Sequence, residues 1–274
     1  MIINFTKMHA LGNDFVIIDA ISQHIKLSKS YIKKIADRKI GIGCDQVIMI
    51  EPPLHEHLDF YYKIYNANGE IAEQCLNGVR CAARFVLDNG LISGSELTAE
   101  SLGGIVSLKV ANDNSILTIL ANINSIISDL HFKYLDLNIN AYTVSVGNPH
   151  LICFIDYSNN LSQLSQNLED PSYIDIADYL NGRSDLFTQG INIGFAKLIA
   201  PDIIGLRVFE RGSGETLACG TNAVAASIVG KKLHFTSNKV TVKFKLGNLI
   251  IELINNEIHI IGHANAIFSG KFKI

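Results

Sequence analysis

The chain has 274 residues, of which 48% are hydrophobic and 18% charged, and its formal net charge at pH 7 is −3. This length can bury a large core in one or two domains, while the small negative charge argues against a surface for nucleic acid or anionic membranes. No apolar run approaches the ~20 residues that span a bilayer, and residues 1–9 lack the features of a secretory signal, so we expect a cytoplasmic protein that acts on a small molecule.

The first half of the chain contains short strands and one exposed helix. The helix is predicted over 28–39, because Ser28 is a favourable N-cap and Ile32 and Ile35 lie on one face. Gly41, beyond its end, is typical of a helix stop. Alternating or compact apolar runs between turn residues predict strands at 2–7, 15–19, 47–50, 60–65 and 105–111.

A different kind of helix follows Cys75, where an irregular polar loop gives way to an apolar run at 79–87. The second half has the same arrangement, because Cys219 precedes an apolar run at 223–229. The strands predicted around this second run lie at 143–146, 151–155, 203–209, 240–245, 249–253 and 258–262. A helix that is apolar around most of its circumference must be surrounded, so we expect a curved sheet wrapped around one buried helix, made twice.

An internal duplication is indicated by residues that recur in the two halves. The recurring pairs are Cys75 and Cys219, Tyr65 and Phe209, Asn77 and Thr221, Ala82 and Ala226, and Gly12-Asn13 and Gly147-Asn148. The sequence therefore predicts an α+β fold of two pseudo-symmetric lobes, each a curved β-sheet or barrel around a central buried helix. The N-terminal lobe, 1–125 plus 265–274, carries Cys75, and the C-terminal lobe, 126–264, carries Cys219. The polar stretch 122–128 is the best boundary.

The cysteines are not arranged for disulfides or zinc. The five are Cys44, Cys75, Cys81, Cys153 and Cys219. An odd count without a C-x-x-C pair predicts reduced thiols and no metal. Free cysteines are among the most buried residue types, so Cys44, Cys81 and Cys153 are interpreted as core residues. Cys75 and Cys219 differ because each begins a helix, where unpaired N–H groups and the macrodipole lower the pKa of a thiol.

Two such thiols suit the inversion of a carbon stereocentre next to a carboxylate. One sulfur removes a proton from one face of the carbon, and the other supplies a proton to the opposite face. The charge that develops spreads into the carboxylate, so donors must already point at its oxygens, and the first amides of each helix provide them. These are the amides of Leu76, Asn77, Gly220 and Thr221. The scheme needs no cofactor, and the sequence has no phosphate-binding Gly-Lys-Ser/Thr loop.

Several motifs are distributed over the chain from Lys7 to its C-terminus. They are Lys7-Met-His-Ala-Leu-Gly-Asn-Asp-Phe15, Gly41-Ile-Gly-Cys-Asp-Gln46, Tyr65-Asn-Ala-Asn-Gly69, Gln74-Cys-Leu-Asn-Gly-Val-Arg80, Gly147-Asn-Pro-His150, Ile191-Asn-Ile-Gly194, Glu210-Arg-Gly-Ser-Gly-Glu-Thr216 and Ala218-Cys-Gly-Thr221. In this combination the chain resembles the diaminopimelate epimerase family of cofactor-independent amino-acid epimerases. Leu76 and Asn222 depart from the pattern, because the family has glycine at both positions.

The resemblance implies a reaction and the roles of the site residues. The reaction inverts one α-carbon of LL-diaminopimelate to give the meso form, in lysine and peptidoglycan precursor synthesis. Cys75 and Cys219 are the acid and base, which interchange with the reaction direction, and His150 and Glu210 tune the pKa values of the thiols. The implied substrate contacts are Asn13, Gln46, Asn66, Leu76, Asn77, Asn148, Asn192, Glu210, Arg211, Gly220 and Thr221. The resemblance also implies a homodimer.

Three alternatives remain open at this point. The same chemistry can act on another amino acid, as in the related proline racemases, although Asn66, Asn192 and Arg211 favour a substrate with a distal amino-acid group. A thiol redox protein would instead join Cys75 and Cys219 in a reversible disulfide. A non-catalytic amino-acid binding protein would keep its affinity without either thiol. Exchange of the α-proton distinguishes the epimerase from the last two.

Overall fold

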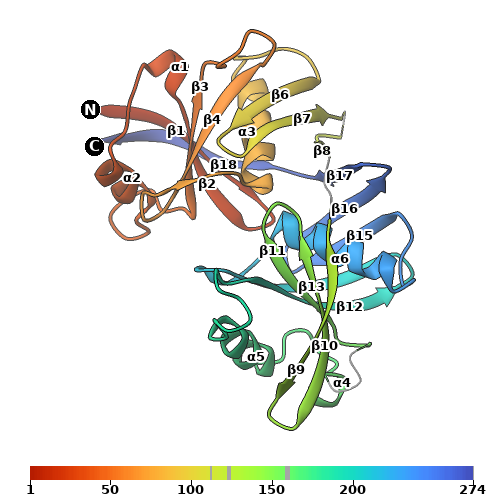
Figure 1. Ribbon diagram of the computed structural model, residues 1–274. Helices are drawn as coiled ribbons and strands as arrows, with labels where there is room; N and C mark the ends of the chain where they lie inside the picture. Colours follow the sequence, from red (N-terminus) through yellow and green to blue (C-terminus); the bar gives the residue numbers. More distant parts are fainter. Residues whose placement is uncertain (112, 122–124, 158–160, 274) are drawn as a thin grey trace. The chain divides into compact units, whose positions relative to one another are not determined.

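The structure of the chain is a computed structural model that describes residues 1–111, 113–121, 125–157 and 161–273. The chain folds as an α+β protein with two compact units, one formed by Met1–Ile119 and Ile261–Ile274 and the other by Leu120–Ile260 (Figure 1). The predicted boundary at 122–128 includes 122–124, which lie outside the described residues. No helix within the described ranges is long and apolar enough to cross a bilayer.

Both units consist of many short strands and a few helices. The elements that lie in or begin in the first unit are β1 (Ile2–Ala10), β2 (Asn13–Asp19), α1 (Ala20–Gln23), α2 (Lys29–Ala36), β3 (Gln46–Glu51), β4 (Phe60–Asn66), β5 (Ile71–Ala72), α3 (Leu76–Asp88), β6 (Glu96–Ser101), β7 (Gly104–Val110), β8 (Ile116–Ala121) and β18 (Asn265–Lys273). Those of the second unit are β9 (Ile127–Tyr134), β10 (Leu137–Ser145), β11 (Pro149–Phe154), α4 (Leu161–Leu164), α5 (Ser172–Asn181), β12 (Asn192–Ala200), β13 (Ile203–Glu210), β14 (Gly214–Thr216), α6 (Gly220–Lys232), β15 (Lys239–Phe244), β16 (Gly247–Ile254) and β17 (Glu257–Gly262).

The strand pairing repeats in the two units. In the first, β1–β2 is antiparallel, β2–β3 parallel, β3–β4 antiparallel, β4–β6 parallel and β6–β7 antiparallel. In the second, β10–β11, β11–β12, β12–β13, β13–β15 and β15–β16 follow the same sequence of directions. α3 and α6 occupy equivalent places, each between a very short strand and the next long one. The predicted internal duplication is confirmed.

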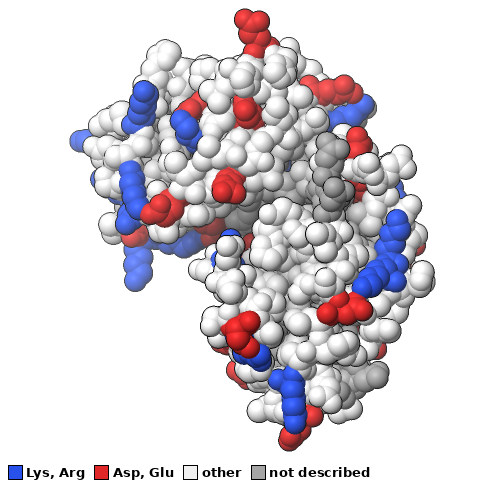
Figure 2. Space-filling model, in the orientation of Figure 1, with Lys and Arg blue, Asp and Glu red and all other residues white. Residues whose placement is uncertain are grey.

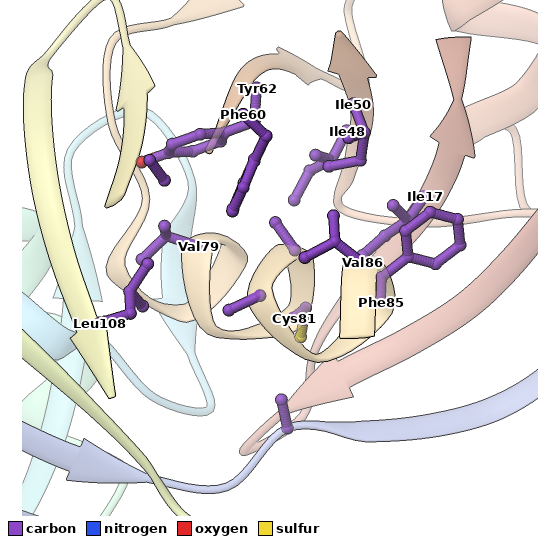
Figure 3. Packing of buried hydrophobic residues seen from close by; sticks show 14 of the residues in the cluster. Ile17, Ile48, Ile50, Phe60, Tyr62, Val79, Cys81, Phe85, Val86 and Leu108 are labelled. Carbon is purple, nitrogen blue, oxygen red and sulfur yellow. The ribbon is translucent and has the colours of Figure 1, made fainter. Parts of the chain in front are cut away.

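Each unit surrounds one helix with strands, as predicted. In α3, Val79, Cys81 and Val86 are fully buried and pack in one apolar cluster with strand residues that include Ile48 and Phe60 (Figure 3). α6 packs against β10, β11, β12, β13, β15 and β16 of its own unit, and its residues from Ala223 to Ala226 are fully buried. Burial of an apolar side chain of the size of valine contributes about 1.5–3 kcal/mol, so both helices are held by packing.

The predicted exposed helix is shorter than expected. α2 runs from Lys29 to Ala36, and the Ser28 side chain accepts a hydrogen bond from the Tyr31 amide as its N-cap. The helix ends at Ala36 because Asp37 is extended, with φ −63° and ψ 123°. Residues 37–39 of the prediction therefore lie outside the helix.

Several elements are not predicted from the sequence at all. They are β5, β6, β8, β9, β12, β14 and β18 among the strands, and α1, α4 and α5 among the helices. β18 exposes most of its side chains, β9 buries only one of its eight, and neither strand shows clean alternation. Backbone pairing holds them instead, β9 to β10 and β18 to β1. The partner of β18 is distant along the chain, whereas β9 pairs with the strand that directly follows it, and local patterning reveals neither strand.

A network of ion pairs ties β1 and β2 to the loop after α2. Lys7 Nζ lies 2.5 Å from Asp14 Oδ2 and also donates to the carbonyl of Gly43. Arg38 bridges Asp14 at 2.7 Å and Asp45 at 2.8 Å. Burial alone would raise the pKa of Asp14, but hydrogen bonds from Arg38 and Lys7 lower it overall. The carboxylate therefore stays ionised in the folded protein and stabilises it.

Other ion pairs are exposed. Lys29 pairs with Glu70 and Lys109 pairs with Glu96, with more than half of each side chain accessible. On the face shown in Figure 2, basic and acidic side chains are interspersed rather than separated by sign. Exposed pairs of this kind contribute only about 0–1 kcal/mol each.

Replacement of Asp14 provides a test of the network. Asp14→Asn leaves Lys7 buried with only a carbonyl partner, so we expect a loss of about 3 kcal/mol in the free energy of unfolding at pH 7. The folded pKa of Asp14 lies below its ordinary value of 3.8, so its stabilisation is complete above that pH and declines as the pH falls further. The difference in the free energy of unfolding between the wild-type protein and Asp14→Asn, measured by urea titration, should therefore become smaller below about pH 4.

Glu70→Gln is the matched control, because it removes a carboxylate from an exposed pair in the same unit. We expect a change below about 0.5 kcal/mol. Two results would contradict the stabilising role of ionised Asp14. One is an equal loss of free energy of unfolding in Asp14→Asn and Glu70→Gln, and the other is a difference between wild type and Asp14→Asn that stays constant as the pH falls.

Candidate active site

Cys75 begins α3 and acts as its N-cap. Its backbone is extended, with φ −145° and ψ 112°, and its side chain is half-buried. The amide of Gly78 donates to Cys75 Sγ at 3.3 Å. A sulfur at this place receives one of the unpaired helix amides and lies at the positive end of the macrodipole, both of which favour a thiolate. The predicted helix start at Cys75 is confirmed, and its chemical role stays a prediction.

Asn13 lies beside this sulfur. Leu11 and Gly12 turn β1 into β2 with positive φ angles of 55° and 90°, which places Asn13 at the start of β2. Asn13 Oδ1 lies 3.7 Å from Cys75 Sγ, and Asn13 Nδ2 donates to Asp45 Oδ2 at 3.1 Å. Cys75 thus has an acceptor for its proton and an amide donor for its lone pair, so both protonation states are accommodated.

Asn77 and the pair Gln46–Asn66 complete the polar groups of this half. Asn77 Nδ2 lies 3.4 Å from Asn13 Oδ1. Gln46 and Asn66 are cross-strand neighbours on β3 and β4, and Gln46 Nε2 donates to Asn66 Oδ1 at 2.9 Å. Gln46 Oε1 is buried and has no hydrogen-bond partner within the described residues. Such an acceptor suits an ammonium or amide donor of a ligand.

Cys219 begins α6 in a similar way, with φ −135° and ψ 120°. Its surroundings differ from those of Cys75, because a hydroxyl contacts the sulfur. Thr221 Oγ1 lies 3.3 Å from Cys219 Sγ and 2.9 Å from His150 Nε2. His150 Nδ1 lies 3.0 Å from the carbonyl oxygen of Asn148. These contacts form a chain from the backbone through the imidazole and the hydroxyl to the thiol.

The protonation of this chain follows from burial. His150 is fully buried, and desolvation lowers its pKa to about 4, so the ring is neutral at pH 7. A carbonyl only accepts, so Nδ1 carries the ring proton and Nε2 accepts from the Thr221 hydroxyl. The Thr221 oxygen then accepts from the Cys219 thiol. Burial, together with the charge of Glu210, raises the pKa of Cys219 well above its ordinary value, which also favours the thiol.

Glu210 and Arg211 lie where β13 ends. Glu210 accepts a hydrogen bond from Thr216 Oγ1 at 2.5 Å. The Arg211 guanidinium donates to the carbonyl of Gln189 at 2.9 Å, and its amide donates to Asn192 Oδ1 at 2.9 Å. This geometry brings the predicted contacts Asn192 and Arg211 together.

The remaining predicted residues have defined places. Asn148 Oδ1 is buried and lacks a hydrogen-bond partner in the described part of the chain. Leu76 and Gly220 are the first residues of α3 and α6, and both are buried. Asn222 is fully buried and fits because Gly194 has no side chain, since a Cβ there would lie 2.3 Å from Asn222 Oδ1.

The structure adds residues that the sequence did not single out. Asp45 holds Asn13, Thr216 holds Glu210, and the Gln189 carbonyl holds Arg211. Asp45 and Thr216 occur inside motifs quoted above, and this place in the motifs is the signal by which the sequence could have identified them. Thr221 was predicted only for its amide, whereas its hydroxyl contacts both His150 and Cys219.

The other cysteines lie in the cores, as predicted. Cys44, Cys81 and Cys153 are buried, and all five cysteines are free. Burial raises the pKa of Cys44 and of Cys153 to about 12 and also raises that of Cys81. Across the described ranges, no group of three or more His, Cys, Asp or Glu residues is placed to hold a metal ion.

Two comparisons with known sequences, a family model and a curated relative, carry the same description. The family model described as diaminopimelate epimerase matches residues 5–122 and 142–267. A diaminopimelate epimerase of Nitrosospira multiformis is 35% identical over 289 residues, covering 100% of this chain and 99% of that protein.

Solved structures share the fold at low identity. The crystal structure of a PhzF-family phenazine biosynthesis protein from Bacillus anthracis has a TM-score of 0.72, 15% identity and 100% coverage of both chains. A hydroxyproline epimerase from Agrobacterium vitis, with bound trans-4-hydroxy-L-proline, has a TM-score of 0.74 and 11% identity, covering 98% of this chain and 92% of the other. By the family model and the sequence relative together, the chain belongs to the diaminopimelate epimerase family.

Proposed function

We propose that the chain epimerises LL-diaminopimelate to meso-diaminopimelate without a cofactor, in lysine and peptidoglycan precursor synthesis. The observation that carries the proposal is the pair of cysteines that begin the two buried helices, Cys75 on α3 and Cys219 on α6. Membership of the family supports this substrate. The proposed mechanism places a base and an acid on opposite faces of one α-carbon.

In the proposed LL-to-meso direction, Cys75 is the base and Cys219 the acid. The Cys75 thiolate takes the α-proton, the carbanion delocalises into the carboxylate, and the Cys219 thiol protonates the other face. The product leaves Cys75 as a thiol and Cys219 as a thiolate, so the reverse reaction uses the same groups with exchanged roles. Two observations support the role of Cys219 as the acid. Its pKa is raised, and the Thr221 oxygen lies where it can accept a hydrogen bond from the Cys219 thiol.

His150 and Glu210 tune the second thiol in this proposal. Neutral His150 orients the Thr221 hydroxyl, which leaves the oxygen ready to accept from the Cys219 thiol. Negative charge on Glu210 disfavours a second negative charge on Cys219. The two residues therefore keep the acid protonated until the carbanion forms.

The amides and polar side chains are proposed to bind the two ends of the substrate. The first amides of each helix, at 76–77 and 220–221, accept the reacting carboxylate. Arg211 provides a charge-assisted donor for the distal carboxylate, and Glu210 an acceptor for an ammonium. The unpartnered oxygens of Gln46 and Asn148 are suited to the same ammonium groups. Asn13, Asn66, Asn77 and Asn192 are the remaining proposed contacts.

Assembly and location are also proposals. A homodimer is supported by exposed apolar side chains on the paired strands β1 and β18, namely Ile2, Ile267 and Phe268. A cytoplasmic location is supported by the five free thiols.

The alternative is the same two-cysteine chemistry on another amino acid. Leu76 and Asn222 carry side chains where the family has glycine, and both are buried next to the first turns of the two helices. A panel of amino acids tested for α-proton exchange distinguishes the two substrates.

Exchange of the α-proton in D2O tests the proposed function. The wild-type protein with LL-diaminopimelate should incorporate deuterium at the α-carbon, followed by NMR, as the meso form appears. Cys75→Ala and Cys219→Ala should each lose epimerisation by about 10³-fold, because one proton-transfer group is missing. Cys153→Ala is the control, since it removes a buried thiol of the second unit away from either helix start.

The outcomes separate the alternatives. A redox protein would show no exchange but a reversible Cys75–Cys219 disulfide. A binding protein would show no exchange and would retain affinity for the amino acid in both alanine variants. Absence of α-proton exchange with reduced wild-type protein and LL-diaminopimelate would overturn the proposed function.

The buried His150 makes stability depend on pH. Its folded pKa of about 4 lies below the ordinary 6.5, so the unfolded chain binds a proton that the folded protein does not. The stabilisation that depends on neutral His150 should be complete above pH 6.5. The free energy of unfolding should fall by about 3 kcal/mol as the pH is lowered from 6.5 to 4. His150→Gln should reduce this pH dependence in urea titrations, whereas the exposed control His24→Gln should keep it. If the free energy of unfolding changed equally with pH in the wild-type protein, His150→Gln and His24→Gln, this would contradict a neutral His150.

A further inference from the structure

We propose that Arg80 is a positioning residue for the Cys75 half of the site, holding Asn77 and placing a fixed positive charge beside the thiol when it ionises. This inference rests on the proposed function and adds to it a residue with no assigned role. Arg80 lies in α3, five positions after Cys75, inside the helix that the first unit surrounds.

Arg80 is a fully buried cation with few partners. It is among the largest side chains of the protein that are completely inaccessible. Its Nη2 donates to Asn77 Oδ1 at 2.5 Å, while Nε and Nη1 have no hydrogen-bond partner within the described residues. Burying a charge without a counter-ion costs several kcal/mol, so this arrangement is not explained by folding stability.

Arg207 in the second unit shows how a nearly buried arginine is normally held. It donates to Glu215 at 2.8 and 2.9 Å and to the carbonyls of Leu168 and Asp170 at 2.9 and 2.8 Å. The Arg207 charge is therefore matched by a carboxylate in a bidentate pair. Within the residues that the structure describes, no carboxylate forms an ion pair with Arg80, and none occurs in the first turn of α3.

The position of Arg80 in α3 strengthens the case that an anion forms near it. The N-terminal part of a helix is the positive end of its macrodipole, where a cation is unfavourable and an anion favourable. The charges that act on the guanidinium are those of Cys81 and Cys75, which oppose the lowering of the Arg80 pKa by burial. Cys81 stays protonated because its own burial raises its pKa, so Cys75 is the thiol that can provide the anion.

Other titratable groups around α3 do not supply this charge. Tyr62 on β4 is buried, which raises its pKa and keeps it neutral. Charged residues of the surrounding strands form ion pairs elsewhere, as Lys7 with Asp14, Lys63 with Glu51, and Lys109 with Glu96. Glu100 on β6 has a buried oxygen without a hydrogen-bond partner within the described residues, but it alternates along the strand with Leu97 and Ala99, which pack in the cluster around α3, and so lies on the opposite face of the strand.

Arg80 also fixes the orientation of two amides. An arginine only donates, so the atom of Asn77 that faces it is Oδ1. Asn77 Nδ2 is then directed at Asn13 Oδ1, 3.4 Å away, and Asn13 Oδ1 is the atom 3.7 Å from Cys75 Sγ. The chain Arg80–Asn77–Asn13 thus directs Asn13 Oδ1 toward the sulfur, an orientation that the hydrogen bond from Asn13 Nδ2 to Asp45 also favours. The same Asn77 belongs to the helix start that would hold the carboxylate.

The test measures the reactivity of Cys75 without relying on turnover. In a Cys219→Ala background, iodoacetamide alkylation is followed as a function of pH, with the Cys75→Ala/Cys219→Ala protein as the blank for the buried thiols. Arg80→Gln keeps donors for Asn77 and removes the charge, so the pH midpoint of alkylation should rise by about one unit. Arg84→Gln, one turn further along α3 and paired with Asp88, is the control and should leave the midpoint unchanged.

Activity and stability complete the test in proteins that retain Cys219. Arg80→Gln should lower kcat about 10-fold with little change in KM, and its thermal midpoint should be unchanged or higher, because an unpaired buried charge is gone. Arg80→Lys should restore the alkylation midpoint. If Arg80→Gln does not fold, Arg80→Met takes its place, because it removes the charge and fills a similar apolar volume: a midpoint raised by about one unit supports the proposal, and an unchanged midpoint overturns it.

A purely structural role gives a different result. Arg80→Gln would then lower the thermal midpoint and leave the alkylation midpoint where it was, which would overturn the proposal. A shifted alkylation midpoint in a protein that shows no α-proton exchange would overturn the proposed function and leave the role of Arg80 beside Cys75 standing.

Discussion

The structure depends on one constraint, the burial of a helix start among the strands that surround the helix. The first amides of α3 and α6 have no partners within their helices, and a buried helix end cannot leave them all to water. At α3 a sulfur accepts from one of these amides. The same geometry that satisfies the backbone therefore places a polarisable, ionisable group at the positive end of a helix.

The two units share this design but surround their thiols differently. Cys75 is half-buried among amide side chains and has both a donor and an acceptor nearby. Cys219 is buried and contacts a hydroxyl oriented by a neutral imidazole. The two helix starts occupy equivalent places in the repeated fold, and the adjacent strands and turns give each sulfur different hydrogen-bond partners.

The sequence predicted the parts of this arrangement that depend on local pattern. Apolar circumference identified α3 and α6, their cysteines identified the helix starts, and recurring residues indicated the duplication. Strands such as β9 and β18 escaped because few of their side chains are buried, so that backbone pairing defines them and an alternating apolar pattern does not. Asp45, the Thr221 hydroxyl and the unpaired Arg80 charge escaped because hydrogen-bond partners and burial are properties of the folded chain.

The pairing of β18 with β1 has a consequence for biosynthesis. The second unit is continuous in sequence, so it can acquire its structure while translation is still in progress. The first unit closes only when Asn265–Lys273 reaches β1, more than 250 residues after that strand has left the ribosome. Its central helix, with Cys75, must wait in an incompletely covered state, which is the stage at which chaperones would engage the nascent polypeptide.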